Sequence, residues 1–383
     1  MSGEHTRSEY APREAGHASS GEQPKGAERV ASFIRKNYSY MVLSMVFLGI
    51  LTGSVAPTQV QSLKPFMLPL TGIMVWAMTV TIKFSELAQS GKKVKQIILA
   101  LLFCYVFFPI ISFALAISFL SSKPEWAIGF ILMGSVPTAG MNVVWTGMLK
   151  GDLPLSIILN AIMMFLGIIT IPTITALFAG VWVKVSMVDL LWAVLTNLVI
   201  PLFFGFLTRY ALEALSKKSL PKYLPIFSST SAIIAMVLMF SMVSINIPMI
   251  PAEPYILLLL VLPPLFAFPL VFGLPYLVCS RVLHLSYEEQ VAIVYSSGMK
   301  HLPLATSLAF ASFGPAAAFP IAISAVFQTT FASTFYRLFQ RMQRRFDRCS
   351  RNDSIFSKLV AGGGFEPPIS GFPSRTYEPR GIT

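Results

Sequence analysis

The sequence is poor in charge and lacks the motifs of the common enzyme and metal sites. Only 12% of its 383 residues are charged, while 55% are hydrophobic. The three cysteines Cys104, Cys279 and Cys349 form no C-x-x-C pair, which argues against a zinc site or a disulfide framework. There is no G-x-S-x-G, no H-E-x-x-H and no pair of carboxylates inside the apolar segments, so nothing indicates an enzyme. This composition excludes a soluble two-domain protein and is typical of an all-α polytopic membrane protein.

The two ends of the chain have little hydrophobic character. The first 30 residues lack the apolar core of a cleavable signal peptide, and we expect residues 1–34 to be a disordered cytoplasmic tail. At the other end, residues 341–383 are first basic and then rich in Gly and Pro, and we expect a cytoplasmic tail with no fold from about Asp347 onward. The residues between them, 35–340, are expected to form the membrane domain.

Ten apolar runs, each close to the length that crosses a bilayer as a helix, fill the membrane domain. They lie at about 38–55, 66–83, 97–120, 126–149, 153–180, 187–208, 223–246, 253–279, 287–311 and 314–336. An even number of spans places both termini on one side of the membrane.

The basic residues indicate which side that is. If the termini are cytoplasmic, the outer joints hold only Lys64, Lys123 and Lys184, and the other basic residues of the joints face the cytoplasm. We therefore expect a multi-pass protein of the cell membrane with both termini cytoplasmic. The net charge of +12 is then an orientation signal that also attracts anionic membrane lipid, and it gives no reason to expect a nucleic-acid partner. Oligomeric state is not indicated.

Ten spans divide into two halves of five, at about 38–180 and 187–340, and an odd number per half inserts the second half upside down. The fourth span of each half, which is helix 4 or helix 9 of the ten, is interrupted by small residues and a proline. In "GFILMGSVPTAGMNVVWTGMLKGD" the break falls at about 137–140, and in "VAIVYSSGMKHLPLATSLAFASFG" it falls at about 296–303. The pattern predicts two inverted five-helix repeats with broken crossover helices, an architecture found in transporters.

A helix that opens inside a membrane leaves backbone groups without partners, and such a break survives only inside protein or beside a cavity. Two breaks at equivalent places predict a site at the membrane midplane, where half-helix N-termini favour an anion and freed carbonyls hold a cation. Two ordinary proline kinks are the alternative. Polar residues gather around the breaks: Thr138, Asn142, Thr146, Ser156, Asn160, Ser296, Ser297, Lys300, His301, Thr306 and Ser307.

The stretch "GSVPTAGMNVVWTGMLKGDLPLSIILN" (134–160) resembles the bile acid:sodium symporter superfamily, which includes arsenite exporters. The shared features are the small-residue break, the short half-helix, a basic-Gly-Asp joint at 150–152 and a Leu-Ser pair at 155–156. The resemblance continues through "SSGMKHLPLATSLAFASFG" and covers about 35–340. It implies a core domain of spans 3–5 and 8–10 that moves against a panel of spans 1, 2, 6 and 7, with the substrate between them. It implies no cofactor, and Na⁺ or H⁺ as the coupling ion.

The resemblance also implies two sodium sites, and this chain departs from both. The first falls on Asn142, Val143, Ser156, Asn160 and Ser296, and the second on Cys104, Ser296, Ser297, Met299 and Lys300. The acid that is usual at Ser296 is missing, and Lys300 stands where the family has a glutamine. We expect the ammonium of Lys300 to be a built-in cation in place of one sodium; the alternative is that it snorkels or pairs elsewhere.

The predicted function is a secondary active transporter of a small organic anion, a carboxylate or a bile-acid-like molecule, with weak or altered sodium coupling. The residues expected to bind the substrate are Thr138, Gly140, Asn142, Ser297, Gly298 and His301, and those expected at the cation site are Asn142, Ser156, Asn160, Ser296 and Lys300. His301 either binds the anion, exchanges a proton or is satisfied by a carbonyl of the break. Two alternatives are an oxyanion exporter and a transport-inactive sensor. Arsenite is disfavoured, because Thr138 occupies the cysteine position of the exporters and the second break holds no acid.

Overall fold

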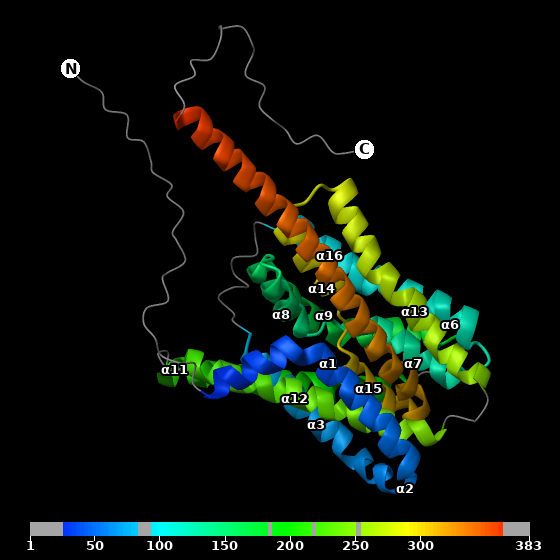
Figure 1. The fold of residues 1–383 in the computed structure, drawn as a ribbon. Coiled ribbons are helices and arrows are strands. Elements are labelled where there is room, and N and C mark those ends of the chain that lie inside the picture. Colours follow the sequence, from blue (N-terminus) through cyan, green and yellow to red (C-terminus); the bar gives the residue numbers. More distant parts are fainter. Residues whose placement is uncertain (1–25, 83–92, 183–185, 217–219, 250–253, 363–383) are drawn as a thin grey trace. The chain divides into compact units, whose positions relative to one another are not determined.

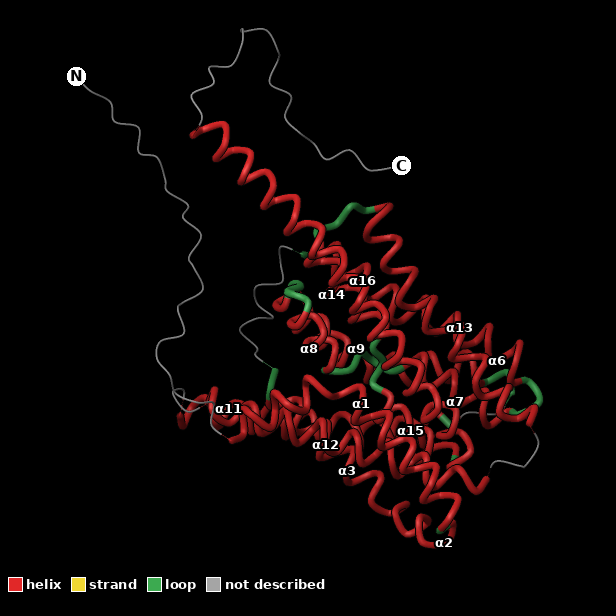
Figure 2. Tube along the Cα trace, viewed as in Figure 1, coloured by secondary structure: helices red, strands yellow, loops and turns green. Residues whose placement is uncertain are grey.

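The computed structural model describes residues 26–82, 93–182, 186–216, 220–249 and 254–362 (Figures 1 and 2). Every regular element in these ranges is a helix. The chain divides into two compact units, Met1–Ala332 and Ser333–Thr383. The prediction of an all-α protein is confirmed for the described part of the chain.

One group of helices in the first unit is built around α12 (Leu220–Asn246), which packs against α1 (Gly26–Val55) and α3 (Met67–Val80). Helix α3 also packs against α11 (Ile200–Ser216), and Figure 1 shows α1, α3 and α12 side by side. The helix α10 (Met187–Val194) and the π-turn η4 (Leu195–Val199) continue directly into α11, and short elements complete this group: α2 (Pro57–Val60), η1 (Gln61–Phe66) and η5 (Ile247–Met249).

The second group contains both broken helices. Its elements are α5 (Val94–Leu102), the π-turn η3 (Phe103–Phe107), α6 (Phe108–Leu120), α7 (Pro124–Ser135), α8 (Met141–Met148), α9 (Leu153–Ala179), α13 (Pro254–Leu277), the π-turn η6 (Val278–Val282), α14 (Tyr287–Gly298), α15 (Leu302–Phe313) and the part of α16 (Pro315–Gly362) that belongs to the first unit. Helix α7 packs against α6 and α9, and α14 packs against α13 and α8. The predicted breaks are confirmed, because α7 and α8 are separate helices, as are α14 and α15.

Seven helices in the described residues are long and apolar enough to cross a membrane. They are Pro57–Val80, Val94–Leu120, Leu153–Ala179, Met187–Leu215, Tyr223–Asn246, Leu258–Val282 and Pro315–Gln343. Two further apolar helices, Tyr40–Val55 and Leu302–Phe313, are shorter. The chain is a multi-pass membrane protein.

Both predicted tails contain helix. Helix α1 begins at Gly26, inside the segment 1–34 that we expected to be disordered, and α16 continues to Gly362, inside the segment 341–383. The physical reason is that good helix formers such as Ala, Arg and Gln follow Gly26 and Arg337 without an intervening proline. The remaining parts of the tails, 1–25 and 363–383, lie outside the described residues, as do the joints at Lys92 and Lys217.

A cluster of charges fixes the joint between α8 and α9. Asp152 caps α9 by accepting from the backbone N–H of Leu155 at 3.0 Å, and it forms an ion pair with Lys93. The Lys93 ammonium also lies 3.6 Å from Glu289 in α14. Burial lowers the pKa of Lys93, but its hydrogen bond and charge interaction with Asp152, with help from Glu289, outweigh burial and raise the pKa above its usual value.

Candidate functional site

The two broken helices cross and bind each other through their backbones. The N–H of Ala139 donates to the carbonyl of Met299 at 2.7 Å, and the N–H of His301 donates to the carbonyl of Pro137 at 2.9 Å. The Thr138 hydroxyl also donates to Met299 O, at 2.9 Å. Backbone groups that the breaks expose are thus paired within the protein, as a membrane interior requires.

A single side chain from α16 completes the second break. The N–H of Lys300 donates to Gln328 Oε1 at 2.9 Å, and Gln328 Nε2 donates to the carbonyl of Lys300 at 3.0 Å. Gln328 is buried. The sequence reasoning missed this residue, although a lone glutamine in the apolar run 314–336 was a signal that a buried polar partner was needed.

The side chain of Lys300 ends in a cage of carbonyl oxygens and is 0% exposed. Its Nζ donates to the carbonyls of Cys104 at 2.7 Å, Val136 at 2.9 Å and Gly134 at 3.0 Å. The Cys104 thiol lies 3.1 Å away, and the centre of the Phe108 ring lies 4.7 Å away, where a cation–π interaction adds attraction. An ammonium has three protons to donate, so the three carbonyls match its capacity.

Freed carbonyls are the partners that we expect for a cation at a break, but the hydroxyls of Ser296 and Ser297, which are the nearest candidates in the chain, do not contact the ammonium. Instead, the Ser297 hydroxyl donates to the Ile293 carbonyl of its own helix, and Ser296 accepts from Asn142 Nδ2 at 2.9 Å. A carbonyl that a helix end leaves without an N–H partner is a stronger acceptor than a hydroxyl that is already engaged. The ammonium therefore stabilises the first break rather than the second.

The other residues predicted for the cation site form a buried polar cluster between α8, α9 and α14. The Thr146 hydroxyl contacts Ser156 Oγ at 3.2 Å and donates to the Asn142 carbonyl at 2.8 Å. The Oδ1 atoms of Asn142 and Asn160 are buried without a hydrogen-bond partner. A sodium ion accepts oxygen ligands of this kind, although every oxygen here is neutral. The cluster fits a sodium ion in its chemistry, but it lacks the carboxylate that would hold one tightly.

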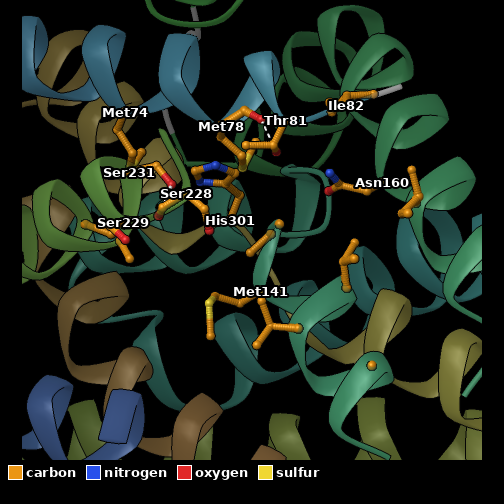
Figure 3. A pocket seen from close by; sticks show the side chains of 18 of the residues that line it. Met74, Met78, Thr81, Ile82, Met141, Asn160, Ser228, Ser229, Ser231 and His301 are labelled. Atoms are coloured by element: carbon orange, nitrogen blue, oxygen red, sulfur yellow. Dashed lines mark hydrogen bonds between the residues drawn. The ribbon is translucent and has the colours of Figure 1, made fainter. Parts of the chain in front are cut away.

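A cavity of about 490 Å³ lies beside the breaks. The N-terminal ends of α8 and α15 open into it, and α1, α3 with the two residues after it, α9 and α12 supply the rest of its described wall (Figure 3). Among the described residues its lining contains no Lys, Arg, Asp or Glu. The side chains are mainly apolar with a few polar groups: Met74, Met78, Met141, Met148, Ser228, Ser229, Ser231, Asn160 and His301.

The structure divides the six residues expected to bind substrate into two sets. Gly140 and His301 line the cavity. The other four are buried in the protein instead: Thr138, Asn142, Ser297 and Gly298. Their side chains or backbone hold the breaks together. Gly298 shows this most clearly, because a Cβ atom there would lie 2.7 Å from the Phe272 ring, whereas a Cβ at Gly140 would meet only the flexible Met78 side chain.

His301 lines the cavity at the start of α15. It is the N-cap of α15, and its Nδ1 accepts from the Leu304 N–H at 3.3 Å. In a neutral imidazole with Nδ1 accepting, the proton sits on Nε2. Protonation at Nδ1 would remove the cap, so the geometry favours a fixed donor for an anion over a group that exchanges protons.

Comparison with known proteins finds one matching family model and several similar transporters. The family model of the sodium bile acid symporter family matches residues 65–250. The uncharacterized sodium-dependent transporter YocS of Bacillus subtilis is 25% identical, over 74% of this chain and 86% of YocS. The probable sodium/metabolite cotransporter BASS1 of Arabidopsis thaliana is 26% identical, over 84% of this chain and 78% of its own length.

The arsenical-resistance protein Acr3 of Corynebacterium glutamicum is also similar, with 24% identity over 64% of this chain and 70% of Acr3. The family and its sodium-coupled relatives are transporters, not enzymes. The resemblance seen in the sequence is confirmed, and this chain is a relative of the sodium bile acid symporter family.

Proposed function

We propose that this protein is a secondary active transporter that moves a small organic anion across the cell membrane by alternating access. The observation that carries the proposal is the crossing of two broken helices beside a cavity whose described lining residues carry no charged side chain. The N-terminal ends of α8 and α15 bring partial positive charge to the cavity, and His301 adds a donor. The part of the cavity lining that the structure describes holds no acid that would repel a carboxylate.

The arrangement of helices supports ten spans in two inverted repeats. The seven long helices, the apolar part of α1 and the two broken pairs together make ten. Helices α1, α3, α11 and α12 pack as one group, which corresponds to a panel, and the cavity is lined from both this group and the group with the breaks. Movement of the second group as a core against the panel would expose the cavity to either side.

Coupling in this proposal differs from that of a two-sodium symporter. The Lys300 ammonium supplies one positive charge that remains with the protein throughout the cycle. Sodium is left with the cluster of Asn142, Ser156, Asn160 and Ser296, where only neutral oxygens are offered. Sodium coupling should therefore be weak or restricted to one ion.

The test is flux into proteoliposomes with a panel of small carboxylates, a bile acid and arsenite, with sodium, potassium and pH varied. We expect uptake of a carboxylate, loss of uptake in Lys300→Met, and impaired uptake with some gain of sodium response in Lys300→Gln. Binding without flux for every anion would indicate a sensor, and uptake of arsenite alone would indicate the exporter. Wild-type uptake by Lys300→Met would rule out the built-in cation.

The proposed orientation is tested separately. A single cysteine placed at position 217 should react with an impermeant reagent only from the cytoplasmic side. Labelling only from outside would overturn the inverted repeat along with the topology.

A further inference from the structure

The carbonyl of Cys104 is free because of the sequence that follows it. In the π-turn η3 the N–H of Phe108 donates to the carbonyl of Phe103, five residues earlier. In an α-helix the Phe108 N–H would donate to the Cys104 carbonyl instead. In a longer π-helix the N–H of residue 109 would donate to that carbonyl, but residue 109 is a proline and has no N–H. The Cys104 carbonyl is left with the Lys300 ammonium, at 2.7 Å.

The other two carbonyls of the cage come from the end of α7. The helix ends at Ser135 because Val136 is extended, with ψ 154°, and a proline follows. Its last carbonyls have no helical partner, and they lie at the negative end of the helix dipole. At Gly134 the helix approaches α6 closely, because a Cβ atom there would lie 2.6 Å from Ser112 Oγ. Helix α6 directly continues η3, so this approach brings the carbonyls of both elements together.

From this arrangement we propose that the three carbonyls form a monovalent-cation site in their own right, which the Lys300 ammonium fills. When the lysine is cut back, the same oxygens should bind a free alkylammonium ion. Pro109 is a positioning residue, because it keeps the Cys104 carbonyl free. The inference extends the cation part of the proposed function, but it requires no transport and its test measures stability, so each can fail without the other.

The first experiment uses Lys300→Ala in the full chain. This change removes three methylene groups and the ammonium, which together have the shape of n-propylammonium. We expect a lower thermal unfolding midpoint than in wild type in detergent, and a saturable recovery with n-propylammonium. The uncharged n-propanol should give no recovery. Lys300→Met is the matched control at the same position, because its side chain fills the space and should prevent the recovery.

Two results would overturn the inference here. One is a folded Lys300→Ala protein whose midpoint n-propylammonium does not change. The other is an equal shift in Lys300→Met or with n-propanol, which would mean that the cation acts elsewhere or that only the apolar volume matters.

A second experiment tests Pro109 and does not need Lys300→Ala to fold. Pro109→Ala restores an N–H that competes for the Cys104 carbonyl. It should lower the unfolding midpoint when Lys300 is present and lower it less, or not at all, in Lys300→Met. Pro172→Ala in α9 is a control for removing a proline inside a helix, and its effect should be the same in both backgrounds. Equal effects of Pro109→Ala in the two backgrounds would contradict its role.

Discussion

The substitution Gln328→Met tests whether one side chain from α16 holds the second break. Methionine keeps the length and the unbranched shape of glutamine but removes the amide that pairs with both backbone groups of Lys300. Both groups are buried, but the Lys300 carbonyl also accepts from the Leu302 N–H at 2.9 Å, so only the Lys300 N–H is left without a partner. A buried N–H without a partner costs about 1–3 kcal/mol, and we expect a loss of about that size in the free energy of unfolding.

The assay is unfolding of the purified protein in detergent, followed by tryptophan fluorescence, with three variants compared. Gln328→Glu keeps an acceptor for the Lys300 N–H, and the Lys300 carbonyl still has the Leu302 N–H, so we expect a smaller loss than in Gln328→Met at a pH low enough to keep the buried carboxyl neutral. Ser324→Ala is the matched control on the same helix, because the Ser324 hydroxyl is buried and donates only to the Pro320 carbonyl, at 2.7 Å. Its cost should be below about 1 kcal/mol, since it removes a local bond and leaves no backbone N–H unpaired.

A Gln328→Met protein as stable as Ser324→Ala would refute the reasoning. It would mean that the backbone of Lys300 finds other partners when the amide is removed, and that the second break does not depend on α16.

Three further predictions follow from the site and its surroundings. Gly298→Ala should lower stability, because its methyl group would press on an aromatic ring, whereas Gly140→Ala should reduce uptake and leave the unfolding midpoint near that of wild type; the reverse pattern would exchange their roles. Uptake should depend on sodium with a Hill coefficient of about one or less and lose that dependence in Asn160→Leu, while a coefficient near two would contradict the loss of one sodium site. The pKa of Lys93 is raised in the folded state, so its contribution to stability is complete below the ordinary lysine pKa of 10.5 and is lost as pH rises through the folded-state pKa. As pH rises from neutrality, the difference in free energy of unfolding between wild type and Lys93→Met should therefore shrink only above 10.5. With the Lys93 side chain 39% exposed, that difference should be below about 1 kcal/mol, and a difference that shrinks between neutrality and the ordinary lysine pKa of 10.5 would refute it.

Much of the fold could be predicted because the bilayer imposes simple requirements on the sequence. Apolar runs of the right length marked the helices, and small residues with a proline marked both breaks, since few other sequences open a helix inside apolar surroundings. The ends of α1 and α16 were predicted less well. Polarity was taken as a sign of disorder there, but the helices continue from Gly26 and to Gly362 in polar sequence that local propensity favours.

The sequence predicted the identity of the site residues better than it predicted their contacts. The importance of Lys300 followed from a charge in the middle of an apolar span, and this reasoning required no structure. Two features of its surroundings also followed, since the resemblance implies Cys104 at the same site and freed carbonyls were expected to hold a cation. The two carbonyls at the end of α7, those of Gly134 and Val136, did not follow. The oxygens that hold the ammonium are backbone atoms, which every residue has, and only the local geometry decides which of them is free.

A proline in an apolar run is nevertheless a signal for such an oxygen. The π-turn η3 ends two residues before Pro109, and η4 ends two residues before Pro201, with the N–H after each turn bonded five residues back. In both cases the proline withholds the donor that the carbonyl five residues earlier would need. The signal indicates which backbone carbonyl lacks an N–H donor, but not which group will donate to that carbonyl. At Cys104 the donor is Lys300, which is 196 residues away in the chain and becomes a neighbour only through the crossing of the two breaks. The cation site therefore depends on Pro109 and Lys300, each of which can be recognised in the sequence alone, and on the crossing of the two breaks, which brings them together.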